Sequence, residues 1–290
     1  MQIVYHLGAH FTDEERLLKC LIANHELLQS EGVAVPDPKT YRGPLRDMAV
    51  RLKGRAASED QQRDLLTQIL GQAQLERLVL SWDSFLSLPP WVLKETMYPA
   101  AGERVQAFRQ IFASHEVEFF LALRNPATLL PLLYQRNKPE SYDMFLGGSD
   151  PYELRWSYVI ARILELNPQV QLTVWCDEDT PLVWPEVLRA VAGLPADQPL
   201  VGENELLAML MSGEGLARLQ AYLDTRPPTS IEQRRKIVSA FLDKFALPER
   251  IDMAVEMPSW DQEMIDDLTA IYEEDVAKIA ASGKVTFIQP

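Results

Sequence analysis

Four side chains able to do acid–base or anion-binding chemistry follow predicted β-strands in this sequence. His6 and His10 follow an apolar run that starts at residue 2, Asp83 follows the strand predicted over 76–81, and Arg124 follows the strand predicted over 116–123. Ligands of open parallel sheets bind just beyond the carboxyl ends of the strands. A histidine there can act as a base or an electrostatic helper, and an arginine can bind phosphate through two parallel hydrogen bonds. We therefore predict that these four residues meet at one edge of a sheet.

Each of these residues also has a simpler interpretation that the sequence leaves open. A buried histidine is more often a packed, hydrogen-bonded core residue, Asp83 can cap the following turn, and Arg124 can pair with a carboxylate of this acidic chain. Asp177, Glu178 and Asp179 follow another predicted strand and could bind a divalent metal. A loop leading into a capped helix explains them better, so we predict no metal site.

The first twenty residues have the layout of an anion-binding unit. Residues 3–5 are β-formers, Gly8 and Ala9 are small enough for a tight turn, and leucines from Leu17 onward recur with helical spacing. The unpaired amides at the N-terminus of a helix attract anions. The layout therefore predicts a strand–turn–helix unit whose turn faces an anion.

Acidic side chains nevertheless stand at the start of that predicted helix. Thr12 and Glu15 have the spacing of a capping box, in which each side chain accepts a hydrogen bond from the backbone amide of the other. Asp13 and Glu14 add two more carboxylates, each expected to stabilise the helix by roughly 0.3–1 kcal/mol. They would occupy the same positive potential as a phosphate and repel it. We therefore predict a turn that fills its own anion site.

This stretch also resembles the opening of bacterial sulfotransferase-family proteins, which reads approximately H-x-G-x-H-K-T-G-T-T-S-L-Q. The matching residues are His6, Gly8, His10, Thr12 and Leu17, followed by Asn24, Gly32 and Pro36. The resemblance implies a P-loop α/β fold. It also implies 3′-phosphoadenosine 5′-phosphosulfate as the sulfuryl donor and a hydroxyl group of a small molecule or carbohydrate as the acceptor.

The resemblance further assigns roles to individual residues. Gly8, Ala9 and Thr12 would surround the donor's 5′-phosphosulfate. Arg124, within Arg-Asn-Pro, would match the arginine that holds the donor's 3′-phosphate. The catalytic residues would be His10, His6 and Asp83, the last as counterpart of a glutamate in the family's Ser-x-Glu.

The chain departs from the family pattern where the donor would bind. The family's loop lysine, glycine and three hydroxyl-bearing residues are replaced here by, in order, Phe11, Asp13, Glu14, Glu15 and Arg16. The serine that relatives carry eight residues after the arginine is Leu132. The framework of the family is thus present without most of its donor-binding side chains.

Composition restricts the classes of partner. The chain has 290 residues, 47% of them hydrophobic, and a formal net charge of −14, which argues against nucleic acid and anionic membranes as partners. No apolar run reaches the ~18–20 residues of a membrane span, and the N-terminus lacks the pattern of a signal peptide. Two cysteines form no disulfide framework. We expect a cytoplasmic protein.

The order of predicted elements indicates an α/β fold with a mostly parallel sheet flanked by helices. Strands and helices alternate over residues 1–192, which we predict to be the α/β core. Residues 193–290 read as a helical extension packed on that core, with one short strand at 285–288. The oligomeric state stays open.

Two functions are compatible with these patterns. The first is sulfuryl transfer from 3′-phosphoadenosine 5′-phosphosulfate to a hydroxyl acceptor. The second is a catalytically degenerate protein, a pseudoenzyme that keeps the fold as a binding or scaffold module. A nucleoside-triphosphate kinase is excluded because the chain lacks G-x-x-x-x-G-K-[ST].

Overall fold

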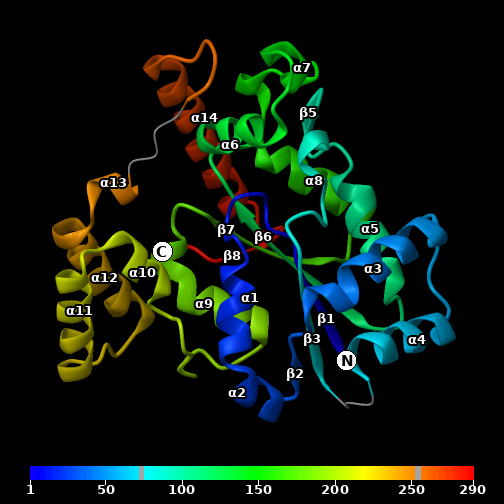
Figure 1. Cartoon of the computed structure of the whole chain (residues 1–290), viewed down its shortest axis with the longest axis horizontal. Coiled ribbons are helices and arrows are strands. Elements are labelled where there is room, and N and C mark those ends of the chain that lie inside the picture. Colours follow the sequence, from blue (N-terminus) through cyan, green and yellow to red (C-terminus); the bar gives the residue numbers. More distant parts are fainter. Residues whose placement is uncertain (72–74, 252–255) are drawn as a thin grey trace.

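The computed structural model describes residues 1–71, 75–251 and 256–290 of the chain. Its centre is a six-stranded sheet in the order β2-β3-β1-β6-β7-β8, in which every pairing is parallel (Figure 1). The strands are β1 (Gln2–His6), β2 (Val33–Ala34), β3 (Arg77–Ser81), β6 (Glu116–Leu123), β7 (Gln171–Cys176) and β8 (Thr286–Phe287). This sheet confirms the predicted α/β class.

The central strands β1, β3 and β6 are buried on both faces because their sequences are nearly continuous runs of apolar residues. Along β1, Ile3 and Tyr5 pack into one core cluster while Val4 packs into the other. Along β6, Phe119 likewise faces the first cluster and Phe120 the second. The two-residue period of a strand thus divides one apolar run between two layers of helices.

Helices cover both faces of the sheet. They are α1 (Arg16–Ala23), α2 (His25–Ser30), α3 (Pro38–Leu52), α4 (Glu59–Leu70), α5 (Ala101–Ile111), α6 (Pro126–Asn137), α7 (Tyr142–Leu146), α8 (Trp156–Leu166), α9 (Thr180–Ala192), α10 (Glu205–Leu210), α11 (Gly213–Thr225), α12 (Ile231–Phe245), α13 (Pro248–Ile251) and α14 (Gln262–Ala281). Buried side chains of α3, α4, α5, α6, α8 and α14 line the larger cluster, and those of α1, α2 and α9 line the smaller one. The remaining elements are a small hairpin, β4 (Leu93–Lys94) with β5 (Thr96–Met97), and two 3₁₀ turns, Pro89–Trp91 and Pro151–Glu153.

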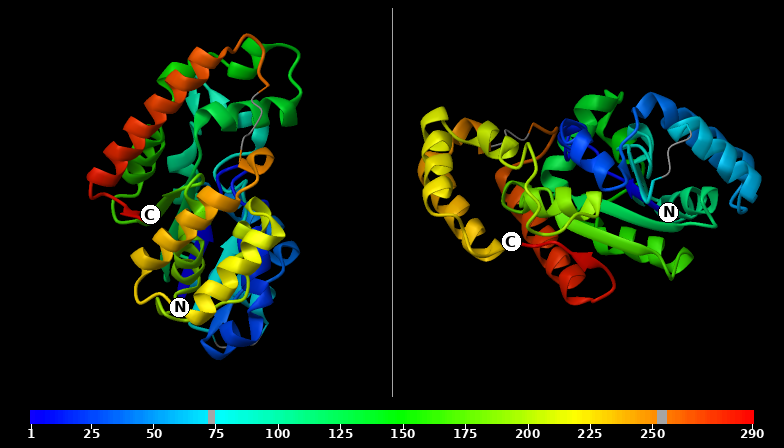
Figure 2. Two further views of the ribbon diagram at one scale, coloured as in Figure 1. Left: turned by 90° about the vertical axis from the view of Figure 1, so that its left-hand side faces the viewer. Right: turned by 90° about the horizontal axis from the view of Figure 1, so that it is seen from below.

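Helices α10 to α12 form a group beside the sheet (Figure 2). The group has its own small core around Leu207, Leu219 and Val238. The side-chain amide of Asn24, at the end of α1, exchanges two hydrogen bonds with the backbone of Val201, at 2.8 and 2.9 Å. The segment leading into α10 is therefore fixed to α1.

The last helix returns to the central layers. Tyr272 and Ile279 of α14 belong to the larger core cluster, and Asp275, which is 1% exposed, accepts a hydrogen bond from the backbone amide of Ser157 at 2.9 Å. β8 then pairs with β7 inside the stretch predicted as a strand at 285–288. The C-terminal part of the chain thus adds both a helix and a strand to the α/β layers.

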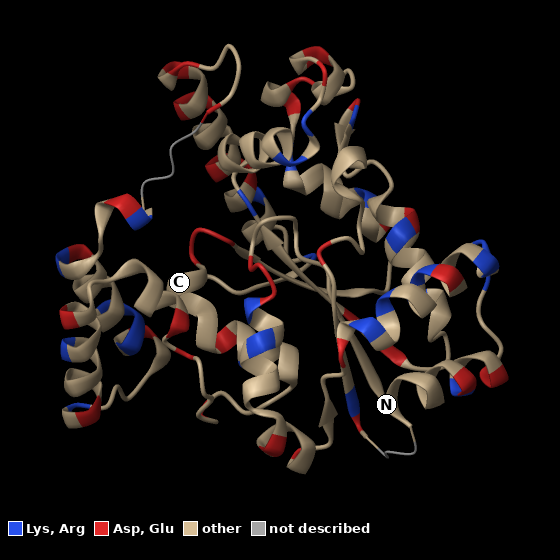
Figure 3. Ribbon diagram, viewed as in Figure 1, with Lys and Arg blue, Asp and Glu red and all other residues tan. Residues whose placement is uncertain are grey.

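Charged residues of both signs are interspersed over the outer helices (Figure 3). Within the described ranges, no helix combines the length and apolarity that crossing a bilayer requires.

Candidate functional site

The carboxyl ends of four neighbouring strands bring the predicted residues to one edge of the sheet. His6 is the last residue of β1, Ser81 ends β3, Arg124 follows β6 and Asp177 follows β7. Because all these strands run parallel, their ends meet at the same edge. His6, His10, Asp83 and Arg124 therefore lie at the edge of the sheet at which they were predicted to lie.

The turn after β1 is hydrogen-bonded to β6 beyond the end of the strand. Leu7 N donates to Phe120 O at 2.8 Å and Ala9 N to Ala122 O at 3.2 Å, while Gly8 O accepts from Ala122 N at 2.6 Å. The turn is thus held against the neighbouring strand. One of the amides that an anion would use, that of Ala9, is already bonded.

Gly8 has a positive φ of 88°, which favours glycine, and the loop after β3 approaches it closely. A Cβ built on Gly8 would lie 3.1 Å from the Cα of Asp83. The small residue predicted from the sequence is therefore required by backbone conformation and by packing against Asp83.

The predicted capping box of Thr12 and Glu15 is wrong. Helix α1 begins at Arg16, later than expected, and Glu15 precedes it in a left-handed conformation without a side-chain cap. The Thr12 hydroxyl donates instead to Ala9 O at 2.9 Å. Asp13 takes the capping role, since its two carboxylate oxygens accept from the amides of Glu15 and Leu17, both at 3.2 Å. The left-handed backbone of Glu14 and Glu15 brings the Asp13 carboxylate to these amides, and residue spacing alone does not reveal that conformation.

The other two carboxylates of the turn point to arginines. Glu14 pairs with Arg16 at 3.0 Å, and Glu15 pairs with Arg42 of α3 at 2.8 Å. Arg42 also donates to Ser81 O through Nε and Nη2. Asp13 is therefore the carboxylate that accepts from amides at the start of α1, and the two glutamates pair with arginines.

Arg124 is 8% exposed and lies among protein groups. Nη1 donates to Phe11 O and lies 3.1 Å from Oδ2 of Asp177, and Nε donates to the hydroxyl of Thr128 at 3.2 Å. The guanidinium thus joins the turn after β1 to the loop after β7. This pairing is the simpler interpretation left open by the sequence.

Asp177 is the partner that sequence analysis missed. Its carboxyl has a pKa raised from 3.8 to about 8, mainly by burial; Arg124 opposes this rise, and the charges of Glu178 and Asp13 add to it. Glu178 points elsewhere, accepting from Asn125 N at 2.8 Å and from the Tyr272 hydroxyl at 2.9 Å. The carboxyls of Asp177 and Glu178 thus have different hydrogen-bonding partners.

Both histidines of the turn are 1% exposed, and burial lowers the pKa of each imidazole. Nδ1 of His6 lies 2.9 Å from the Ser81 hydroxyl, and its ring stacks on Trp175. Nδ1 of His10 lies 2.8 Å from the Tyr98 hydroxyl. Among the described residues neither Nε2 atom has a hydrogen-bond partner.

A pocket of about 450 Å³ opens beside the turn. Its lining residues are Ala9, His10, Phe11, Asp13, Glu14, Glu15, Arg42, Ser81, Asp83, Pro89 and Arg136. Oδ1 of Asp83 accepts from the Ser84 hydroxyl at 3.0 Å, and the charge of Asp83 raises the pKa of both His6 and His10. His10 and Asp83 therefore share one pocket, whereas His6 and Arg124 lie outside its lining.

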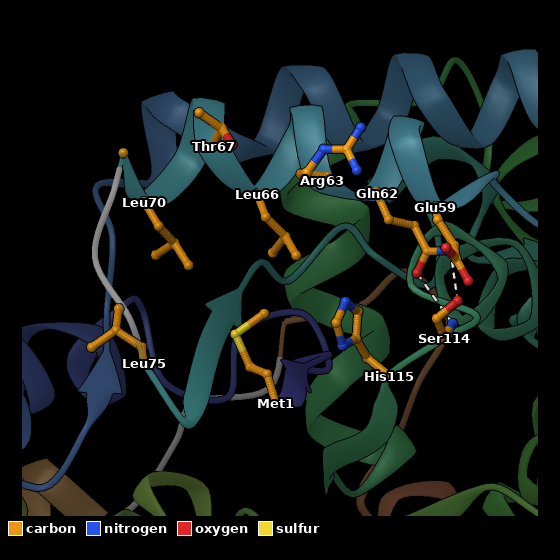
Figure 4. A pocket seen from close by; sticks show the side chains of 11 residues that line it. Met1, Glu59, Gln62, Arg63, Leu66, Thr67, Leu70, Leu75, Ser114 and His115 are labelled. Atoms are coloured by element: carbon orange, nitrogen blue, oxygen red, sulfur yellow. Dashed lines mark hydrogen bonds between the residues drawn. The ribbon is translucent and has the colours of Figure 1, made fainter.

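A second pocket, of about 590 Å³, lies at the opposite edge of the sheet, where the strands begin (Figure 4). Its walls are largely apolar, with Met1, Leu66 and Leu70 around His115. The Gln62 amide there donates to the Ser114 hydroxyl at 3.2 Å and accepts from its backbone amide at 3.1 Å. The polar groups of this pocket thus tie α4 to the start of β6.

The chain is therefore an α/β protein whose parallel sheet has a pocket lined by charged residues at the carboxyl ends of its strands. No family model and no curated protein matches the sequence.

Two solved structures match over most of the chain. One is the sulfotransferase domain of the olefin synthase from Synechococcus PCC 7002, at 14% identity and a TM-score of 0.42, with 93% of this chain and 94% of that chain covered. The other is a sulfotransferase from Alicyclobacillus acidocaldarius, at 14% identity and a TM-score of 0.38, with 82% and 97% covered. Because sequence identity and TM-score are this low, a proposed function has to rest on the residues of the site and not on these two structures.

Proposed function

We propose that the chain is a binding protein for a small hydroxylated molecule, with a sulfotransferase-like donor site closed by its own side chains. The observation that carries this proposal is the hydrogen bonding of residues 9–17. The amides of Ala9, His10, Glu15 and Leu17 are bonded to Ala122 O, to the Tyr98 hydroxyl and to the two oxygens of Asp13. An anion at the start of α1 would have to displace these protein groups.

Arg124 supports the same interpretation. Its guanidinium contacts Phe11 O, Thr128 and Asp177 in a buried position. A phosphate that approached it would have to separate it from these partners and lose their hydrogen bonds.

The open pocket beside the turn favours a neutral polar ligand. Four carboxylates and two guanidiniums line it, and Arg42 is already paired with Glu15. This excess of carboxylates disfavours an anion. A hydroxyl group both donates and accepts, so it can donate to the carboxylate of Asp83 and accept from a guanidinium of the lining.

Calorimetry with 3′-phosphoadenosine 5′-phosphate at low salt tests the closed donor site. We expect no binding to the wild-type protein. Asp13→Asn keeps one acceptor oxygen and replaces the other with an NH2 donor, so it can keep only one of the two cap bonds. It should raise affinity for the nucleotide by removing a charge and freeing one amide. Glu14→Gln removes the same charge from an exposed pair and serves as the matched control. Micromolar binding by the wild type that Arg124→Ala abolishes would overturn the proposal.

Thermal-shift measurements with myo-inositol and D-glucose test the open pocket. We expect at least one of them to raise the Tm by mass action and Asp83→Asn to abolish the increase. A shift that survives in Asp83→Asn, or no shift with either compound at 100 mM, contradicts the choice of ligand.

Sulfuryl transfer to a hydroxyl acceptor is the second candidate. The placement of His10 and Asp83 in a pocket next to the turn favours it, because an acceptor there would lie beside a possible base. The nucleotide calorimetry separates the two functions, since transfer requires the donor to bind.

A further inference from the structure

Tyr98 has no role in either function so far, yet it makes the closest contacts to His10. Its hydroxyl lies 2.8 Å from Nδ1 of His10 and accepts from the His10 backbone amide at 3.3 Å. The side chain is 0% exposed, and its ring stacks on the imidazole at a centroid distance of 5.8 Å. Tyr98 is thus a buried residue that contacts His10 through both its ring and its hydroxyl.

The backbone of Tyr98 is held in an unusual conformation. Its φ is 47°, in the left-handed region that most side chains avoid, and its amide donates to Val92 O at 2.7 Å. Its ring also packs against Trp156 at 5.5 Å. Such a position persists only where the surroundings enforce it, and here it directs a single hydroxyl at His10.

The hydrogens of this cluster can be assigned by elimination. The Tyr98 oxygen already accepts the His10 amide, and among the described residues Nδ1 of His10 is the acceptor within reach of the phenolic hydrogen. If Nδ1 carried the proton, the phenolic hydrogen and the Nε2 lone pair would both be buried without a partner, which costs free energy, whereas the Nε2–H tautomer leaves the Nε2–H group alone unpaired within the described residues. The same cost would apply to a charged imidazolium, whose pKa burial already lowers.

We propose that Tyr98 is a positioning residue that donates to Nδ1 of His10 and thereby fixes the imidazole as the Nε2–H tautomer. His10 then carries a hydrogen on Nε2, which is buried without a hydrogen-bond partner among the described residues, and has no lone pair there with which to take a proton. This inference deepens the proposed function, on which it rests for the ligand. It specifies that a ligand group in contact with Nε2 has to be an acceptor, and it argues against His10 as the base of a transfer reaction.

His6 provides an internal comparison. Its Nδ1 also lies near a hydroxyl, that of Ser81 at 2.9 Å. That serine hydroxyl has no second hydrogen bond within the described part of the chain that would fix its direction, so both tautomers of His6 are compatible with the contact.

Nitrogen-15 NMR of the ligand-free protein at pH 7.5 tests the proposal. We expect His10 to show a protonated Nε2 and an unprotonated Nδ1, with His10→Gln used to assign its signals among the four histidines. Tyr98→Phe should move the tautomer equilibrium measurably toward Nδ1–H. Tyr5→Phe removes another buried tyrosine hydroxyl, one that bonds to Phe108 O, and should leave the His10 signals unchanged.

A protonated Nδ1 or an imidazolium in the wild type would overturn the proposal, as would an unchanged tautomer in folded Tyr98→Phe. If Tyr98→Phe does not fold, the wild-type spectrum still decides the tautomer. Because no ligand is present, this outcome is independent of whether inositol, glucose or the nucleotide binds.

Discussion

Two buried arginines, Arg77 and Arg124, are paired with carboxyl groups at opposite ends of the same sheet. Arg77 lies 3.1 Å from Glu118 at the edge where the strands begin, and Arg124 lies 3.1 Å from Asp177 at the edge where they end. Arg77 is 7% exposed and Arg124 is 8% exposed. By distance and burial alone the two pairs are equivalent.

The remaining contacts separate them. Arg77 also donates to the carbonyls of Val191 and Ala190, which joins β3 to the end of α9. Arg124 joins two loops, through Phe11 O and Asp177. The first pair therefore connects regular elements, whereas the second connects loops at the edge where a parallel sheet normally binds its ligand. The same ion-pair chemistry joins a strand to a helix at one end of the sheet and two loops at the other.

Removing Arg77 should have the largest effect on stability. Arg77→Met leaves Glu118 buried without its cation, and we expect a loss of about 3–5 kcal/mol in the free energy of unfolding. Urea denaturation measures it. The double variant Arg77→Met with Glu118→Leu should recover at least half of this loss. A single variant within about 1 kcal/mol of wild type would contradict the assigned role.

Removing Arg124 should cost less, and its cost should depend on pH. Asp177 can hold a proton in the folded protein because its pKa is raised from 3.8 to about 8. At pH 6, Arg124→Met therefore leaves a neutral carboxyl, and we expect a loss of about 2 kcal/mol. Without Arg124 the pKa of Asp177 rises further, so at pH 9 the folded variant must either hold a proton that the unfolded chain has lost or bury an unpaired carboxylate, and the loss should be larger. Urea denaturation at both pH values tests this, and equal losses would contradict it.

The raised pKa also fixes the sign of the pH dependence in the wild type. The folded protein binds this proton more tightly than the unfolded chain does, so the stabilisation is complete below pH 3.8 and is lost as the pH rises toward about 8. Asp177→Asn, which cannot titrate, should reduce the decline in stability between pH 5 and pH 8. Glu178→Gln on the same loop should reduce the decline less, because Glu178 affects the pKa of Asp177 only through its charge.

Gly8→Ala should destabilise the ligand edge by about 1–2 kcal/mol, because alanine is strained at a φ of 88° and its Cβ meets Asp83. Gly213 is a control without either constraint, since a Cβ there meets no atom within 4 Å. Thermal denaturation should therefore show Gly213→Ala close to wild type. If Gly8→Ala were as stable as the wild type, the turn would have to accommodate a Cβ at this position without strain.

The smallest change is expected for Glu14→Gln. Glu14 pairs with Arg16 on the surface, with 70% of its side chain exposed, so the effect should stay within about 0.5 kcal/mol. Urea denaturation at low salt checks it. A larger loss would show that the carboxylates of the turn act together rather than through Asp13.

The sheet could be predicted because its information is local. The apolar runs of β1, β3, β6 and β7 lie within the sequence itself, and parallel order follows from their alternation with helices. The convergence of His6, His10, Asp83 and Arg124 followed from the same reasoning, since each comes just after a strand.

The contacts that decide function could not be read in this way. Asp177 and Tyr98 reach their partners from 53 and 88 residues away, distances at which spacing patterns carry no information. The capping prediction failed for a related reason. Thr12 and Glu15 have suitable spacing, but left-handed residues at Phe11, Glu14 and Glu15 turn the chain so that Asp13 reaches the amides first.

The anchoring of α1 through Asn24 has a consequence for redesign. Strand β1 is fixed in the sheet and the far end of α1 is fastened to Val201, so residues 8–15 form a bridge between two immobile supports. A replacement loop must join the same two ends and keep the contacts of Gly8 with Asp83 and of Phe11 O with Arg124. A lysine- and threonine-bearing loop of this length would test whether the frame can hold an anion.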